Sequence, residues 1–256
     1  MKKILLIFAL ALFVGSISQA KADDFYKGAS YKLYVGMNGS SFLKINDFYM
    51  EPNEDKDIKL GFNAGFRFDY QFNRYTSIQT GIDYAMKGYL SKTPIHENSI
   101  KTIKERQALS THYLSIPILY GFRYDFDTKT PVQLQFNTGP YIAVGVAGKC
   151  NITNVEKSDY TYVEGVEKYK VFENHDKEDI HYTGENGYDL WRFDMGWKFE
   201  LGFNINSVYL GVAYDLGCVD IQNRYWRDYY KEKFGDNYND YKIKNHSFSL
   251  NVGYIF

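Results

Sequence analysis

Ser110 and His112 are the polar pair in this sequence whose spacing comes nearest to that of a catalytic site. They lie two residues apart, so on a β-strand they share a face, and Glu105 lies upstream. A nucleophile, a base and a group that orients the base are the parts of a hydrolase. The spacing is common by chance, however, and no nucleophile-elbow pattern occurs. An enzyme is therefore the weakest functional hypothesis, and we expect no catalytic residues.

Metal-ligating residue types gather in the segment "ENHDKEDIHY", where His175 and His181 lie among four carboxylates. Neutral imidazoles beside acids bind transition metals. The segment has no tight ligand spacing and no EF-hand pattern, and the two cysteines form no CxxC motif. We therefore interpret the segment as a solvated acidic loop, and expect no metal and no cofactor.

Aromatic residues make up 18% of the chain, and many fall in one charged segment, 219–244. There, charges alternate with Tyr225, Trp226, Tyr229 and Tyr230. Tyrosine-rich exposed loops provide contact area at low entropic cost, which makes these residues candidates for binding an extracellular ligand or protein. In the alternative, the rings pack into a cap or lie in an aromatic belt at a membrane interface. The residues alone leave both interpretations open.

The elements that must position these side chains are β-strands. Apolar and polar residues alternate, with the period of two typical of a strand, in eight segments. These segments are 30–38, 60–70, 77–87, 113–124, 132–146, 193–205, 208–217 and 245–256. The chain is therefore expected to be all-β.

The connections between these segments alternate in length. Short ones are expected at 71–76, 125–131 and 206–207, and long ones at 39–57, 89–110, 147–191 and 219–244. All long connections then lie at one end of an up-and-down meander. Short periplasmic turns and long extracellular loops are typical of outer-membrane barrels, and an even strand number lets the sheet close without edges. A soluble lipocalin-like barrel, with its apolar face inside around a greasy ligand, is the rival.

The polar face of the strands favours the membrane barrel. It combines many glycines, which relieve crowding in a narrow barrel, with charges of both signs that could pair in a lumen. We predict a lumen network of Lys59, Arg67, Asp69, Asp83, Lys87, Arg123, Asp194, Lys198, Glu200 and Asp215. Eight strands leave room for little more than their own side chains, so the lumen should be filled. A small pore-forming channel is the alternative.

The first 22 residues have the features of a secretory signal peptide. Lys2 and Lys3 precede an apolar run, and small residues follow. We predict cleavage after Ala22, with Ala20 as second choice, which leaves residues 23–256 as one barrel domain. These residues hold 27 basic and 31 acidic side chains, a formal charge of −4. That balance gives no reason to expect a nucleic-acid partner.

Cys150 and Cys218 are far apart in sequence, and spacing alone leaves a disulfide and two free thiols equally open. In the proposed meander, both follow strands that run toward the long loops. We hypothesise a disulfide that joins the third loop to the fourth.

The order of short motifs resembles a known family. "SIQTGIDYAMKG", "HYLSIPILYGFRY", "FNTGPYIAVGV" and "RFDMGWKFELGFNI" are similar to the outer-membrane β-barrel family labelled porin-family or PorT-like, whose members look similar to the eight-stranded OmpX and OmpA barrels. The end of the chain, with Tyr254 and Phe256, also resembles the signal by which the assembly machinery recognises outer-membrane proteins. The resemblance implies an eight-stranded antiparallel up-and-down transmembrane β-barrel in the bacterial outer membrane, surrounded by lipid. We expect a structural or binding role at the cell surface through the third and fourth loops.

Overall fold

A computed structural model describes residues 28–43, 55–98, 101–158, 162–172, 190–222, 232 and 243–256. Nine strands form one antiparallel sheet in these residues. They are β1 (Gly28–Leu43), β2 (Asp55–Gln71), β3 (Thr76–Asn98), β4 (Lys101–Phe126), β5 (Val132–Ser158), β6 (Tyr162–Lys170), β7 (Phe193–Ile205), β8 (Val208–Gly217) and β9 (Lys244–Ile255). No helix among the described residues has the length and hydropathy needed to span a membrane.

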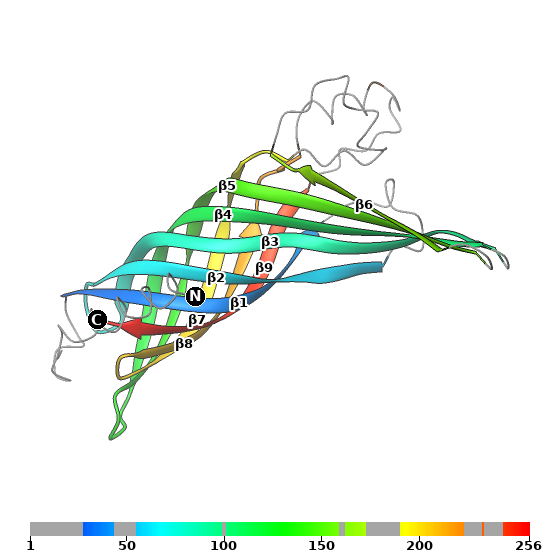
Figure 1. The fold of residues 1–256 in the computed structure, drawn as a ribbon. Helices are drawn as coiled ribbons and strands as arrows, with labels where there is room; N and C mark the ends of the chain where they lie inside the picture. The colour runs from blue at the N-terminus through cyan, green and yellow to red at the C-terminus, as the bar shows by residue number, and fades with distance from the viewer. Residues whose placement is uncertain are drawn as a thin grey trace, which may run out of the picture.

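Eight of these strands close into a barrel. Each pairs with the next along the chain, except that β5 pairs with β7, and β1 pairs with β9 to complete the ring. Figure 1 shows the tilted strands wrapping around a common axis. The predicted eight-stranded antiparallel barrel is therefore confirmed, and β6 is an additional strand outside the ring.

Short turns and the described chain ends gather at one end of the barrel. The turn between β7 and β8 has Asn206 at its start, with a φ of 51° that asparagine tolerates better than most residues. At the same end, the backbone N–H of Phe256 donates to the carbonyl oxygen of Tyr31 at 2.8 Å. The last residue of the chain is therefore tied to the first strand.

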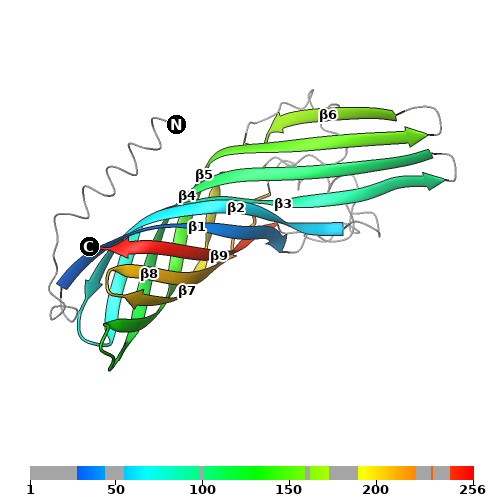
Figure 2. The ribbon, with the colours of Figure 1, turned by 60° about the horizontal axis from the view of Figure 1, so that its bottom comes forward.

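At the opposite end, several strands are much longer than the sequence pattern indicates. The stretch 89–110, expected as a long connection, instead continues β3 and β4, which stay paired as far as Asn98 and Lys101. Strand β5 likewise runs to Ser158 and pairs with β6. Figure 2 shows β3, β4, β5 and β6 projecting beyond the rim as one sheet, which we call the outer sheet. Cross-strand hydrogen bonding extends the strands past the region where alternation is clear.

The apolar faces of the barrel strands point outward. On β4 the outward residues, all 43–58% exposed, are Leu114, Ile116, Ile118, Tyr120, Phe122 and Tyr124. Between them, Leu119 and Arg123 point inward and are buried. An apolar exterior around a polar interior is the pattern of a membrane-spanning barrel, so the soluble lipocalin-like alternative is wrong.

The apolar belt has the height of a bilayer core. From Leu114 to Tyr124, β4 presents eleven residues, the length of a transmembrane β-strand. At a rise of ~3.3 Å per residue and a tilt of ~40°, this stretch covers about 25 Å along the membrane normal. The belt on β4 therefore spans the hydrocarbon region without a charged residue.

A charge in this belt should destabilise the barrel. Ile118 is 55% exposed near the middle of the belt, whereas Phe126 lies on the same face at its end. We expect Ile118→Arg to lower the free energy of unfolding in lipid vesicles by about 2–4 kcal/mol, and Phe126→Arg by at most ~1 kcal/mol. Urea titrations of the two variants measure this difference. Equal effects at both positions would contradict a lipid-facing belt.

Candidate functional site

The lumen contains a continuous chain of six charged side chains. The Arg67 guanidinium binds the Asp83 carboxylate, and its Nη2 atom donates to Glu200 Oε1 at 2.9 Å. Lys198 Nζ lies 3.4 Å from Asp83 Oδ2 and 2.6 Å from Asp215 Oδ1. Three cations and three carboxylates therefore balance, and the chain ends on Lys87, whose Nζ atom lies 3.3 Å from Asp215 Oδ2.

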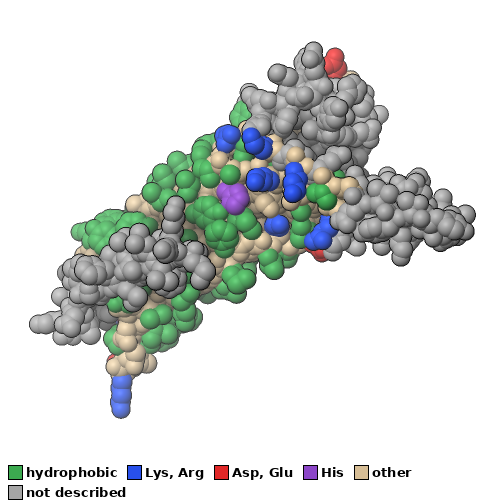
Figure 3. All heavy atoms as spheres, viewed as in Figure 1, with side chains coloured by type: hydrophobic (Ala, Val, Ile, Leu, Met, Phe, Trp, Pro, Cys, Tyr) green, Lys and Arg blue, Asp and Glu red, His purple; other side chains and the backbone are tan. Residues whose placement is uncertain are grey.

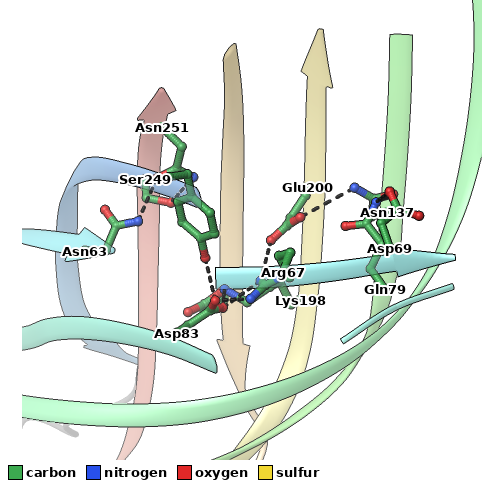
Figure 4. Close-up of polar contacts among 12 residues, drawn as sticks. Asn63, Arg67, Asp69, Gln79, Asp83, Asn137, Lys198, Glu200, Ser249 and Asn251 are labelled. Carbon is green, nitrogen blue, oxygen red and sulfur yellow. Dashed lines mark hydrogen bonds and ion pairs between the residues drawn. The ribbon is translucent and has the colours of Figure 1, made fainter. Parts of the chain in front are cut away.

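These contacts cross the barrel rather than follow its wall. Arg67 on β2 and Glu200 on β7 lie four strands apart in the ring of eight, as do Lys87 on β3 and Asp215 on β8. All four residues are at least 92% buried. Figure 4 shows Arg67, Asp83, Lys198 and Glu200 converging from different strands. Ion pairs therefore cross the lumen at this level.

A second cluster lies nearer the short turns. Arg123 pairs with Asp69, and its Nη1 atom donates to Gln71 Oε1 at 3.1 Å and to Gln133 Oε1 at 3.0 Å. Gln79 Nε2 donates to Asp69 Oδ2 at 2.9 Å. Because a buried charge is costly unless it is paired and hydrogen-bonded, these amides are needed to satisfy the remaining donors and acceptors.

Two members of the predicted network lie outside these ion pairs. Lys59 is half-buried and forms no ion pair within the described part of the chain. Asp194 is buried and accepts a hydrogen bond from Asn245 Nδ2 at 3.0 Å.

Lys32 is a lumen residue that the sequence analysis missed. Its side chain is 4% exposed, and Nζ lies 3.7 Å from the centre of the Tyr209 ring, a cation–π contact. The signal was present in the sequence, because Lys32 occupies the polar face of β1 between Tyr31 and Leu33.

A hydrophobic cap lies at the long-loop end of the lumen. It is a cluster of buried side chains from the barrel rim, the inner face of the outer sheet and the described ends of the third and fourth loops. Its members are Phe42, Tyr89, Leu109, Tyr113, Tyr141, Ala143, Cys150, Ile152, Val171, Phe172, Leu190, Ile221 and Ile243. Backbone hydrogen bonds tie the two loop ends together, since Trp191 N donates to Ile221 O at 2.7 Å and Ile221 N to Ile243 O at 2.9 Å.

Phe172 is held in this cap from two sides. Its ring lies against Gly145 of β5, where a β-carbon would collide with the ring atoms. Arg192 donates from Nη2 to the Phe172 carbonyl oxygen at 3.1 Å and from Nη1 to the Gly145 carbonyl oxygen at 3.0 Å. Glycine at position 145 therefore lets an aromatic ring enter the barrel mouth.

The residues of the hypothetical catalytic triad do not come together. Ser110 and His112 lie on the same half-exposed face of β4, but His112 Nδ1 contacts Tyr84 Oη at 2.5 Å. Glu105 lies five residues from Ser110 on the same strand, about 16 Å away at the usual rise. The described residues also contain no group of three or more His, Cys, Asp or Glu that could hold a metal ion.

In the structure Cys150 is buried, Cys218 is exposed, and the two form no disulfide with each other. Strand β5 continues past the barrel, so Cys150 pairs with Leu109 of β4 and Tyr169 of β6 instead of lying beside β7. Cys218 stays at the rim, where its N–H donates to Met195 O at 2.8 Å. The hypothesised disulfide between the loops is therefore absent, because the strand extension separates the two residues.

Of the other predicted residues, Tyr254 and Phe256 fall within the described part of the chain. Tyr254 is 39% exposed on β9, with its ring centre 5.1 Å from that of Phe256. The loop aromatics Tyr225, Trp226, Tyr229 and Tyr230 lie outside the described residues, as do residues 1–22 and the two acidic-loop histidines.

Comparison with known families gives the same architecture. The family model for the outer membrane protein beta-barrel domain matches residues 17–223, more than half of the chain. The protein belongs to this family. It is therefore a protein of the bacterial outer membrane. No curated relative matches the sequence.

Solved structures with a similar fold include two outer-membrane proteins. The attachment invasion locus protein Ail of Yersinia pestis is 14% identical, with 89% of this chain and 99% of that chain covered and a TM-score of 0.36. OprG of Pseudomonas aeruginosa is 12% identical, with 90% and 97% covered and a TM-score of 0.41. These similarities are too low to transfer a function.

Removal of the central cation should destabilise the barrel strongly. Arg67→Met leaves Asp83 and Glu200 buried without their main partner, so we expect the free energy of unfolding to fall by about 3–5 kcal/mol. The matched control is Arg74→Met, because Arg74 pairs with Asp125 at the exposed turn end and such pairs contribute at most ~1 kcal/mol. Equal losses in urea titrations of the two variants would show that the lumen ion pairs are not structurally important.

Proposed function

We propose that this protein is a non-conducting outer-membrane barrel that holds a binding surface outside the cell. The binding surface consists of the outer sheet together with the third and fourth loops. In this proposal the barrel acts as an anchor, and the aromatic loop residues contact an extracellular ligand or protein. The single observation that carries the proposal is the occluded lumen.

The lumen is obstructed at two levels. The ion pairs between Arg67 and Glu200 and between Lys87 and Asp215 bridge opposite walls, and the hydrophobic cap lies above them. An open pathway would require the ion pairs to separate inside the barrel, where unpaired charges are costly. The contacts among the described residues therefore support a closed lumen and give no support to a channel.

The outer sheet supplies the rigid part of the proposed binding surface. Strands β4 and β5 stay paired continuously from the barrel to Lys101 and Ser158, apart from one irregularity at His112. Binding residues are most effective on a framework that keeps them in place. The loops that connect these strands and those that follow β6 and β8 therefore start from fixed positions.

The motif order also leads us to infer membership of the porin-family, PorT-like group within the broader barrel family. The motifs build the barrel and do not indicate a link to a secretion machinery. We likewise infer that the protein is not an enzyme, because His112 contacts Tyr84 and Glu105 is remote from Ser110. The proposal retains the assembly machinery as a partner that reads Tyr254 and Phe256.

Conductance measurements test the closed lumen. We expect the purified full-length protein to show no discrete conductance steps in planar bilayers, because ion pairs and cap block the path. A conducting eight-stranded or larger barrel added under the same conditions controls for insertion. Reproducible unitary steps from the wild-type protein would overturn the non-conducting assignment.

Cysteine labelling of intact cells tests the orientation. In a Cys218→Ser background, Lys168→Cys on the outer sheet should react with a membrane-impermeant maleimide from outside. Lys129→Cys, in the exposed turn between β4 and β5, is the matched control and should react only after lysis. The reverse pattern would place the outer sheet in the periplasm.

A further inference from the structure

Strand pairing is interrupted along one line where the outer sheet leaves the barrel. Between β2 and β3, four residues at 59–62 lie opposite three at 86–88. Between β4 and β5, two residues at 112–113 lie opposite three at 145–147. Residues 86–88 pair with 110–112 in regular order, which puts both interruptions at the same level of the sheet. We call residues 59–62, 86–88, 110–113 and 145–147 the bend row.

The bend row lies at the long-loop edge of the apolar belt. On β4 it directly precedes Leu114, the last outward residue of the belt, and on β5 it includes the exposed residue Val146. Figure 3 shows hydrophobic surface giving way to polar and basic surface between the barrel and its projecting part. An extra residue in a strand bends it, and Figure 2 shows β3, β4 and β5 curving as they pass into the outer sheet. The bend row therefore sets the direction of the outer sheet.

Two side chains of β1 bind the backbone of β3 at the bend row. Asn38 Nδ2 donates to the Met86 carbonyl oxygen at 2.8 Å, and Ser40 Oγ accepts from the Gly88 N–H at 2.9 Å. The Ser40 hydroxyl also lies 3.2 Å from the Gly88 carbonyl oxygen, to which it can donate. Both side chains are at most 3% exposed. Because unpaired buried backbone groups are costly, these side chains replace the ladder hydrogen bonds that the interruption removes.

These contacts pass over β2, which lies between β1 and β3 in the sheet. Gly61 of β2 leaves the space for them, because a β-carbon there would collide with the Met86 carbonyl oxygen and press on Asn38 Oδ1. Gly88 has a φ of 151°, and a β-carbon at this position would collide with the Leu109 carbonyl oxygen. The bend in β3 therefore needs glycine on two strands and polar side chains from a third.

The other half of the bend row has its backbone groups bound in the same way. Thr111 Oγ1 of β4 donates to the Lys87 carbonyl oxygen at 3.0 Å. Beside the extra residue of β5, Arg192 Nη1 donates to the Gly145 carbonyl oxygen at 3.0 Å, and the Gly145 N–H donates to Arg192 O at 2.6 Å. A change in the angle of the outer sheet would break several of these hydrogen bonds at once.

We propose that the bend row is a fixed joint, in which Asn38 and Ser40 are positioning residues that hold the outer sheet at one angle to the barrel. The role of the joint rests on the proposed function. A binding surface that keeps one angle presents its loops to a ligand in a constant direction, which lowers the entropic cost of binding. The same angle keeps the inner face of the outer sheet on the hydrophobic cap.

Distances between two spin labels, measured by pulsed electron–electron double resonance, test the joint. One label goes on the native Cys218 at the rim, and the other on Arg106→Cys, an exposed position of β4 in the outer sheet. Arg106 lies four residues beyond Ser110, about 13 Å along the strand, so a tilt of ~15° would move its label by roughly 3 Å. Cys150 is buried, and the protein without the Arg106 substitution should give no dipolar signal.

Two double variants remove the same chemical groups from different places. In the β1 variant, Asn38→Ala with Ser40→Ala, we expect the distance distribution to broaden or to shift by roughly 3 Å or more. The matched control is the β9 variant, Ser249→Ala with Asn251→Ala. These two residues are also buried two positions apart on one strand, but they bond to each other and to Asn63 inside the barrel. The β9 variant should keep the wild-type distribution.

Folding and context are controlled separately. Heat-modifiable gel migration shows whether each variant has folded, and Ser40→Ala is compared with Ser249→Ala if a double variant does not fold. All measurements use the full-length protein in detergent micelles without a ligand. The result therefore depends neither on conductance nor on orientation in cells, which are the tests of the proposed function.

Each outcome decides the proposal. A single narrow distribution in the wild-type protein that broadens or shifts only in the β1 variant supports the fixed joint. A broad or double-peaked distribution in the wild-type protein overturns it, because the outer sheet would then move without any substitution. An unchanged distribution in the β1 variant, or an equal change in the β9 variant, also overturns it, because the contacts of Asn38 and Ser40 would then not set the angle.

Discussion

The pairing of charges inside a narrow barrel is the constraint on which the rest of this structure depends. Eight strands enclose a space that their own inward side chains fill, and here many of those side chains are charged. Arg67 contacts two carboxylates from different strands, and Lys198 does the same. The contacts of Arg67 with Glu200 and of Lys198 with Asp83 restrain strands that are distant in sequence. These lumen charges are therefore paired only when the ring closes. Tyr34 adds to this by donating to Asp83 Oδ1 at 2.6 Å.

Small residues make that crowded interior possible. A side chain at Gly202 or Gly211 would meet the Tyr209 ring, which is buried against Lys32. Gly145 has the same relation to Phe172 at the mouth. Aromatic rings therefore fill space that glycines leave free, so both packed rings and ion pairs occupy the lumen. A filled interior of this kind supports the proposed anchoring role.

The long strands change what the loop end of the molecule can do. Strands β3 to β5 carry their pairing far beyond the apolar belt, and β6 widens the projecting sheet. The inner face of this sheet packs into the hydrophobic cap, while the described side chains of its outer face are exposed or half-exposed. One sheet therefore contributes to the cap with one face and leaves the other face accessible. This division explains why buried and exposed side chains still alternate in β4 beyond the apolar belt.

The barrel could be predicted from the sequence alone, because apolar and polar residues alternate along its strands. Successive side chains of a strand point to opposite faces whichever strands pair with it. The eight strands, the apolar exterior and the inward position of Arg67 or Asp83 follow from that period and from the charge of one face. Tertiary structure alone decided which charges meet, because Arg67 and Glu200 are brought together by ring closure. It also decided the length of β3 to β5, since hydrogen bonding to a neighbouring strand does not require an apolar face. For the same reason Cys150 lies far along β5, away from the rim position of Cys218.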